Sequence, residues 1–176
     1  MADSGANVIV GVRENGSSWN LVQEDGMTVK TIEDAAKVRG TGIAKRTNEY
    51  LSQKILEGKA ILALHGDEFA GFCYIESWGN KQYVANSGLI VVEKFRGQGL
   101  AKRIKQRAFA LSRERYPHAK LFGLTTGAAV MKINYELGYR PVTFAELTDD
   151  DAFWKGCQSC VNYPILQEKT LWEYYF

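Results

Sequence analysis

Apolar residues recur in two different periods along this chain, and the change of period separates helices from strands. Between residues 48 and 57 the apolar positions have helical spacing, and Thr47 stands where a capping residue belongs. A second short helix is expected at residues 31–38. From Ala60 the pattern becomes that of strands, and turn residues divide it into runs at 60–64, 69–78 and 83–92. The pattern therefore predicts two helices followed by three consecutive antiparallel strands.

The helical period returns after the third strand. A basic helix is expected from Leu100 to a point before Pro117, with Leu100, Ile104, Ala108 and Leu111 on its buried face. The cations Lys102, Arg103, Lys105 and Arg107 are expected on its other faces. A short strand at 120–124 and a helix that ends at Gly138 complete a βαβ unit. The sequence predicts an α/β fold with a mixed sheet.

The length of the chain favours a single domain. At 176 residues it can bury one core but is short for two. An apolar run at Val8–Val12 predicts an edge strand within an N-terminal extension, residues 1–27. The main α/β core is expected at 28–147, and residues 148–176 are expected to pack on the same domain as a C-terminal extension.

Composition excludes several kinds of partner. The net charge of +2 gives no long-range field that would attract nucleic acid or an anionic membrane. No basic region followed by an apolar stretch opens the chain, and no run of eighteen apolar residues occurs in it, so a cytoplasmic protein without membrane partner is expected.

The chain has too few cysteines for a structural zinc site. Cys157 and Cys160 form a CxxC pair, and the third cysteine, Cys73, lies in a predicted strand. A structural zinc needs four ligands, so these residues cannot complete a site within one chain. No metal is expected, although a metal or disulfide shared across a homodimer stays open.

A glycine-rich loop between the third strand and the basic helix is the clearest candidate for a binding site. Arg96-Gly97-Gln98-Gly99 permits close backbone approach, and the helix start offers unpaired amides to a phosphate. Neither the P-loop nor the dinucleotide fingerprint fits, because Gly99 is followed by Leu100-Ala101-Lys102. The similar string at residues 39–46 follows a polar helical stretch and is interpreted as a loop between helices.

This loop and its setting resemble the GCN5-related N-acetyltransferases, the GNAT superfamily. The string Arg96 to Ala101 fits that superfamily's Arg/Gln-x-x-Gly-x-Gly/Ala signature, and Glu136-Leu137-Gly138-Tyr139 resembles its closing motif. The resemblance covers residues 28–147. It implies a mixed central sheet whose antiparallel N-terminal strands splay from the βαβ unit, with helices on both faces.

The resemblance also implies where an acyl-CoA would bind. Its pantetheine arm would pair with the signature strand, its pyrophosphate would rest on the loop amides, and a backbone N–H near Val91 would polarise the thioester carbonyl. Lys102, Arg103 and Lys105 either contact the adenosine end or form a solvated face. The implied coenzyme A site comprises Ile90, Val91, Val92, Arg96, Gly97, Gln98, Gly99, Leu100, Ala101 and Lys102.

The implied reaction is direct transfer of an acyl group, acetyl foremost, from coenzyme A to an amine of a small molecule. Succinyl-CoA as the donor, and a non-catalytic acyl-CoA-binding regulatory module, stay open. The general acid is in doubt, because Asn134 occupies the place of the superfamily's Tyr. Tyr135 lies one residue further, about 100° around the helix. Glu76, a carboxylate within an aromatic strand, is the candidate base.

The acceptor is expected to be a small amino acid such as glutamate. In the superfamily the loop between the first two helices lines the acceptor side, and here that loop carries Arg39, Lys45 and Arg46. These cations suit a carboxylate and would repel a polyamine.

Overall fold

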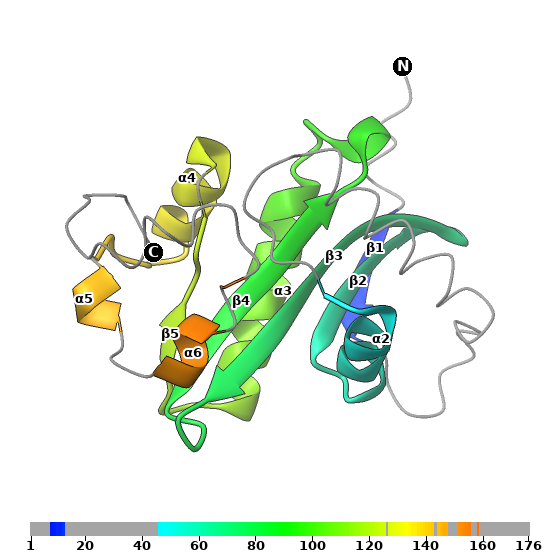
Figure 1. The fold of residues 1–176 in the computed structure, drawn as a ribbon. Helices are drawn as coiled ribbons and strands as arrows, with labels where there is room; N and C mark the ends of the chain where they lie inside the picture. Colours follow the sequence, from blue (N-terminus) through cyan, green and yellow to red (C-terminus); the bar gives the residue numbers. More distant parts are fainter. Residues whose placement is uncertain are drawn as a thin grey trace.

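The computed structural model describes residues 8–12, 46–125, 127–142, 144–147, 151–155 and 158. One five-stranded sheet with the order β1-β2-β3-β4-β5 forms its centre (Figure 1). The strands β1 to β4 pair antiparallel with their neighbours, whereas β5 runs parallel to β4. The predicted α/β fold with a mixed sheet is confirmed.

The strands follow the predicted period closely. Their bounds are Val8–Val12 for β1, Ala60–His65 for β2, Glu68–Trp78 for β3, Tyr83–Val91 for β4 and Lys120–Phe122 for β5. The strand expected at 120–124 therefore ends two residues early, and β4 ends one residue before Val92. The run at Val8–Val12 forms an edge strand against β2, as its apolar pattern predicts.

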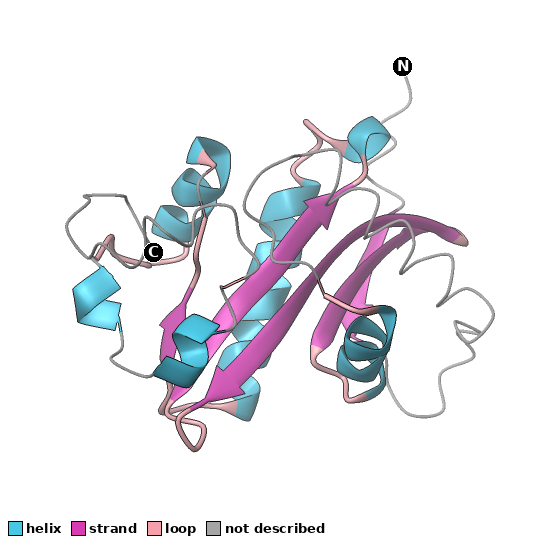
Figure 2. Ribbon diagram, in the orientation of Figure 1, coloured by secondary structure: helices cyan, strands magenta, loops and turns pink. Residues whose placement is uncertain are grey.

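Helices cover both faces of the sheet (Figure 2). On one face α3, Leu100–Arg115, packs Leu100, Ile104, Ala108 and Leu111 against the strands, in agreement with the predicted stripe. On the other face α2, Asn48–Leu56, contributes Leu51 and Ile55 to a separate core with Leu62 and Phe72. The sheet thus separates an α3-side core from an α2-side core.

Local sequence sets the helix ends. Thr47 caps α2 through its hydroxyl oxygen, which accepts the Tyr50 N–H at 3.2 Å. The closing helix α4 spans Ala128–Glu136, and Gly138 follows it with a φ of 91° that few other residues adopt. The helix expected at 31–38 lies outside the described residues.

A third, smaller core lies at the end of the sheet where β5 begins. The short helices α5, Phe144–Leu147, and α6, Asp151–Lys155, bring Leu147 and Trp154 to it. The rings of Trp78, Tyr83 and Phe122 all contact one another, with centroid distances from 5.5 to 5.9 Å. Among the described residues no helix is both long and apolar enough to span a membrane.

Candidate acyl-CoA site

The strands β4 and β5 are paired only where both begin. Three pairs join them, from Tyr83 with Lys120 to Ala85 with Phe122. Beyond Ala85, β4 continues to Val91 without a described strand on that side (Figure 1). The backbone groups of β4 that face β5 over this length therefore have no strand partner among the described residues, as a ligand that pairs like a strand requires.

A bulge in β4 lies within this unpaired length. The pairing with β3 shifts between Phe72 and Tyr74, so that two residues of β4, Gly88 and Leu89, lie opposite Cys73. Gly88 has a φ of 66°, and a Cβ there would lie 2.7 Å from the Tyr74 ring. Glycine is thus required at the bulge both by the backbone conformation and by the aromatic ring beside it.

The three predicted strand residues differ in what they offer a ligand. The Val92 N–H donates to the Ala70 carbonyl at 2.9 Å, so β3 already occupies it. The carbonyl of Val91 accepts the Arg96 Nε–H at 3.0 Å. Because successive amides of a strand alternate in direction, the Val91 N–H points to the unpaired edge, whereas that of Ile90 points to β3. The structure therefore favours Val91 among the three as a donor to a thioester oxygen.

The glycine loop has the geometry of an anion site. After the short 3-10 helix η1, Glu93–Phe95, Gly97 and Gly99 adopt φ values of 76° and 75°, and a Cβ at either would meet no atom within 4 Å. Gly99 is the N-cap of α3 and supplies no side-chain cap. The first amides of this sixteen-residue helix thus receive no side-chain cap from Gly99 and can bind an anion.

The other polar side chains near the loop are partly engaged. The Gln98 side chain donates to the Lys94 carbonyl at 3.2 Å, and the Lys102 ammonium pairs with the Glu136 carboxylate at 2.6 Å. Lys102 and Arg103 are exposed, as a ligand-contacting or solvated face requires. The Lys102 pair also ties the start of α3 to the end of α4.

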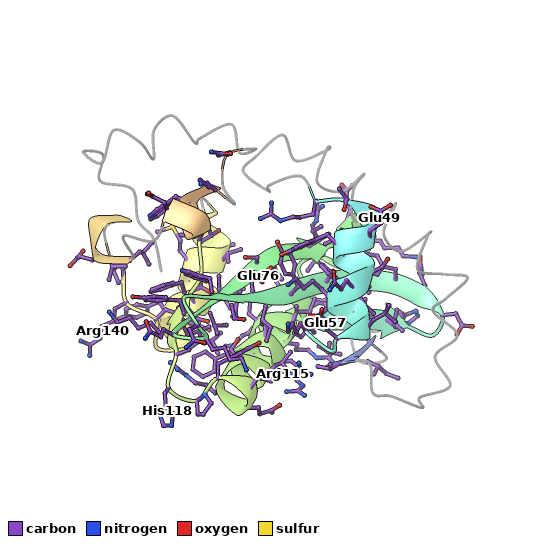
Figure 3. All side chains as sticks on the ribbon, turned by 60° about the horizontal axis from the view of Figure 1, so that its bottom comes forward. Glu49, Glu57, Glu76, Arg115, His118 and Arg140 are labelled. Carbon is purple, nitrogen blue, oxygen red and sulfur yellow. The ribbon has the colours of Figure 1, made fainter. Side chains whose placement is uncertain are left out.

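A polar cluster lies on the opposite face of the sheet, beneath α2. The Glu76 carboxylate accepts hydrogen bonds from the Lys54 ammonium, with N–O distances of 2.8 and 3.0 Å, and from the Tyr50 hydroxyl. The Arg46 Nε–H donates to the Tyr74 hydroxyl at 3.2 Å. Glu49 and Glu57 mark the ends of α2 in Figure 3, and Glu76 lies on the sheet beside that helix. Glu76 and Arg46, predicted for different roles, thus belong to one cluster.

Burial shifts the pKa values of two charged groups in this cluster, Glu76 and Lys54. Desolvation raises the pKa of the Glu76 carboxyl, and the Ser77 N–H and the Arg46 charge oppose the rise only in part. Desolvation also lowers the pKa of the Lys54 ammonium, with the nearby Lys59 charge adding to it. A carboxyl with a raised pKa is a stronger proton acceptor than an ordinary glutamate, which suits a general base.

The two candidates on α4 are in opposite environments. Asn134 is fully buried, and neither its amide nitrogen nor its amide oxygen has a hydrogen-bond partner among the described residues. Tyr135 is 69% exposed, as expected for a residue one helical step away. The structure therefore brings Asn134 into the interior and leaves the Tyr135 hydroxyl in solvent.

The prediction that Lys105 lies on an outer face of the basic helix is wrong. Lys105 is only 2% exposed, and its Nζ donates to the Asn86 side-chain oxygen at 3.3 Å. One step past Ile104, it lies at the border of the apolar stripe, where a polar partner on β4 draws it inward. The sequence signal was Asn86 itself, a polar residue within a mostly apolar strand.

Four residues singled out in the sequence are outside the described part of the chain. They are Arg39 and Lys45 of the expected acceptor loop and the cysteines Cys157 and Cys160. Within the described ranges the free cysteine is the buried Cys73, and no group of three or more potential metal-binding side chains occurs there.

Comparison with solved structures identifies the fold. N-acetylglutamate synthase from Neisseria gonorrhoeae, solved with coenzyme A and N-acetyl-glutamate, matches 87% of this chain and 34% of its own, with a TM-score of 0.61 and 17% identity. A GNAT-family acetyltransferase from Staphylococcus aureus matches 80% of this chain and 89% of its own, with a TM-score of 0.60 and 12% identity. The chain has the GNAT fold.

Sequence comparison finds a different likeness at the N-terminus. The family model of the acetohydroxy acid isomeroreductase NADPH-binding domain matches residues 1–72. Ketol-acid reductoisomerase (NADP(+)) from Methanobrevibacter smithii is 81% identical over 37 residues, which amount to 21% of this chain and 11% of that protein. The chain thus spans about a tenth of the reductoisomerase and about a third of the N-acetylglutamate synthase.

Proposed function

We propose that this protein is an acyl-CoA-dependent N-acyltransferase that moves an acetyl group from acetyl-CoA to the amine of a small molecule. The observation that carries the proposal is the edge of β4 without a described strand partner beyond Ala85, together with the glycine loop at the start of α3. The unpaired edge of β4 suits the amide-containing arm of coenzyme A, and the Gly97–Gly99 loop suits its pyrophosphate. The coenzyme A bound by the similar Neisseria enzyme supports this assignment.

The residues of the chain account for direct transfer without a covalent enzyme intermediate. The Val91 N–H would hold the thioester oxygen as negative charge develops on it. Glu76, with its raised pKa, would accept the proton that the acceptor ammonium must lose before its nitrogen attacks. Lys54, bound to Glu76 at 2.8 Å, occupies the place where an acceptor ammonium would pair with the same carboxylate. We therefore expect the acceptor to displace Lys54 from Glu76 on binding.

We propose an amino acid with a free carboxylate, such as glutamate, as the acceptor. Arg46 lies on the α2 face with Glu76, and Tyr74 and Tyr50 hold its guanidinium there. A guanidinium and a carboxylate close together suit the carboxylate and the ammonium of one amino acid. The N-acetyl-glutamate bound to the Neisseria enzyme supports this choice.

Substitution of Arg46 tests the acceptor assignment. Arg46→Ala should raise KM for glutamate roughly 10-fold to 100-fold, because a charge-assisted hydrogen bond is lost, and leave coenzyme A affinity unchanged. Initial rates with glutamate, aspartate, ornithine and spermidine provide the measurement. Arg140→Ala, an exposed substitution at a different edge of the molecule (Figure 3), is the matched control. Faster turnover of spermidine than of glutamate or aspartate would rule out an acidic amino acid as the acceptor.

The donor is tested with the same reaction. Release of free thiol from acetyl-CoA and from succinyl-CoA, measured with a panel of amino acids and polyamines, compares the two donors directly. Asn134, which stands in place of a tyrosine and has no side-chain partner among the described residues, keeps a non-catalytic acyl-CoA-binding module as the alternative. Binding of acetyl-CoA without turnover of any acceptor in the panel would favour that module.

NADPH binding is a second candidate, raised by the match of residues 1–72 to an NADPH-binding domain. A dinucleotide site of that kind needs parallel strands joined through a helix whose N-terminus holds the pyrophosphate. In the described part of the matched segment β1 instead pairs antiparallel with β2, and β2 with β3.

We accordingly expect no NADPH binding by the full chain. NADPH fluorescence titrated with protein should stay unchanged at concentrations that saturate acetyl-CoA binding, because the described strands of the matched segment pair antiparallel and do not form the parallel unit that a dinucleotide site needs. Acetyl-CoA binding, followed by calorimetry on the same preparation, is the positive control. A saturable fluorescence change that NADP+ reverses would instead make the chain a dinucleotide-binding protein.

A further inference from the structure

The side chain of Tyr50, on α2, contacts three charged side chains of the polar cluster beneath that helix. Its hydroxyl donates to the Glu76 carboxylate, and the Lys54 ammonium lies over its ring, 4.9 Å from the centroid. The Arg46 guanidinium lies over the same ring at 5.5 Å. Two cations and one carboxylate are thus arranged around a single aromatic side chain.

The Tyr50 ring is held in place by its neighbours. Tyr50 is half-buried and packs against the α2-side core. The Tyr74 ring meets it edge-on, with centroids 5.9 Å apart and an angle of 81° between the ring planes. Its backbone N–H donates to the Thr47 hydroxyl at the start of α2. A ring fixed at its backbone, at its edge and at its hydroxyl presents a defined aromatic surface to a cation.

The Lys54 ammonium shows what kind of group this arrangement holds. It is a primary ammonium that contacts the Glu76 carboxylate at 2.8 and 3.0 Å and also lies over the Tyr50 ring. The carboxylate attracts it by charge, and the face of the ring attracts it through the ring quadrupole. Any primary ammonium can make both contacts. An acceptor ammonium that displaces Lys54 from Glu76 would therefore meet the same ring.

The carboxylate of this arrangement is accessible from solvent. The Glu76 side chain is 35% exposed, whereas the Lys54 side chain that pairs with it is 10% exposed. Lys54 lies in the last turn of α2, and a lysine has a flexible four-carbon stem that can carry its ammonium to another position. A ligand from solvent can therefore reach Glu76 when the Lys54 ammonium moves away.

We propose that the Tyr50 ring and the Glu76 carboxylate together bind the ammonium of the acceptor, and that Lys54 occupies this site when no acceptor is bound. Tyr50 is then a specificity-determining residue, because its ring favours a cation and its hydroxyl positions the Glu76 carboxylate. An amino acid that pairs with both Glu76 and Arg46 lies along the ring that both of them contact. This inference rests on the proposed function, since it needs an acceptor at Glu76.

Two substitutions of Tyr50 separate the role of its ring from that of its hydroxyl. Tyr50→Leu removes the ring and should raise KM for glutamate about 3-fold to 30-fold, the range of a cation–π contact. Tyr50→Phe keeps the ring and should leave KM nearly unchanged. Its lost hydrogen bond favours the ionised carboxylate, so the acidic limb of the kcat/KM profile should move to higher pH. A merely structural role for Tyr50 would not separate KM from the pH profile.

Binding without turnover provides a second measurement. With coenzyme A present, calorimetry compares glutamate with 2-hydroxyglutarate, which has a hydroxyl group in place of the ammonium. The unmodified protein should bind glutamate more tightly, and Tyr50→Leu should reduce this preference, whereas Tyr50→Phe should keep it. Phe69→Leu is the matched control, because it removes another ring that packs against the α2-side core, and it should keep the preference too.

The inference is overturned if the unmodified protein binds 2-hydroxyglutarate as tightly as glutamate, a result that does not depend on the folding of any variant. It is also overturned if a folded Tyr50→Leu variant, with the coenzyme A affinity of the parent, keeps the parent's KM and preference. In both cases acyl transfer to glutamate by the unmodified protein would uphold the proposed function. If the unmodified protein turns over no acceptor in the panel, the proposed function fails and this inference fails with it.

Discussion

Gly99→Asp should weaken coenzyme A binding roughly 100-fold while leaving the protein folded. The new carboxylate would lie at the start of α3, where the pyrophosphate is proposed to bind, and two like charges about 4 Å apart repel by ~1 to 4 kcal/mol at the effective dielectric of a protein surface. Steric conflict is small, because a Cβ on Gly99 would have no atom within 4 Å. Calorimetric titration with coenzyme A measures the effect.

The stability of this variant should change little, because two contributions oppose each other. The φ of 75° at Gly99 disfavours any residue with a side chain by about 1 kcal/mol. Aspartate at a helix N-cap gains a comparable amount from the free amides and the helix dipole. Thermal unfolding should therefore show a Tm near that of the parent.

Gly99→Asn is the matched control for charge. Asparagine has nearly the same shape as aspartate and tolerates the left-handed conformation, but carries no charge. The difference in affinity between the two variants isolates the electrostatic part. Unchanged coenzyme A affinity in a folded Gly99→Asp variant would show that the pyrophosphate does not bind at this loop.

Glu76→Gln should lower kcat by about 10²- to 10⁴-fold, the range typical of a lost general base. In the parent, the rate should fall at low pH as Glu76 becomes protonated, and burial places this fall above the pKa of an ordinary glutamate. The activity requires the ionised form, so it is present above the Glu76 pKa and lost as pH decreases through it. In the variant this acidic limb of the kcat/KM profile should disappear.

The ion pair between Glu76 and Lys54 allows a structural role to be distinguished from a catalytic one. Lys54→Met breaks the same pair, 2.8 Å long, but keeps the carboxylate. If the pair only anchors α2 to the sheet, both variants should lose activity alike and neither should lose the acidic limb. Retention of that limb in Lys54→Met together with its loss in Glu76→Gln identifies Glu76 as the base.

The secondary structure was predictable because it depends on local periodicity. Runs of apolar, aromatic and β-branched residues bounded by turns define β2 to β4, and the 3.6-residue repeat of Leu100, Ile104, Ala108 and Leu111 defines the buried side of α3. Glycines mark the turns where the backbone adopts positive φ, as at Gly97 and Gly99. The location of the anion loop follows from the same local signals.

Pairing across the sheet was not predictable in this way. The end of the β4–β5 pairing at Ala85 and the bulge at Gly88 depend on which residues of distant segments lie opposite one another. The same is true of the occupied Val92 N–H, which donates to Ala70 on β3. These features decide which backbone groups of β4 remain available to a ligand.

The sequence by itself determined the order of the elements, the strand-to-helix glycine loop and the presence of Glu76, Asn134 and Arg46, because propensity and spacing act over a few residues. Only the tertiary structure decided that Glu76 binds Lys54 and Tyr50, that Asn134 is buried with no side-chain partner in the described part of the chain, and that Lys105 lies in the interior instead of on the helix surface. The free energy of a polar side chain depends on what surrounds it, and those surroundings come from segments that only folding brings together.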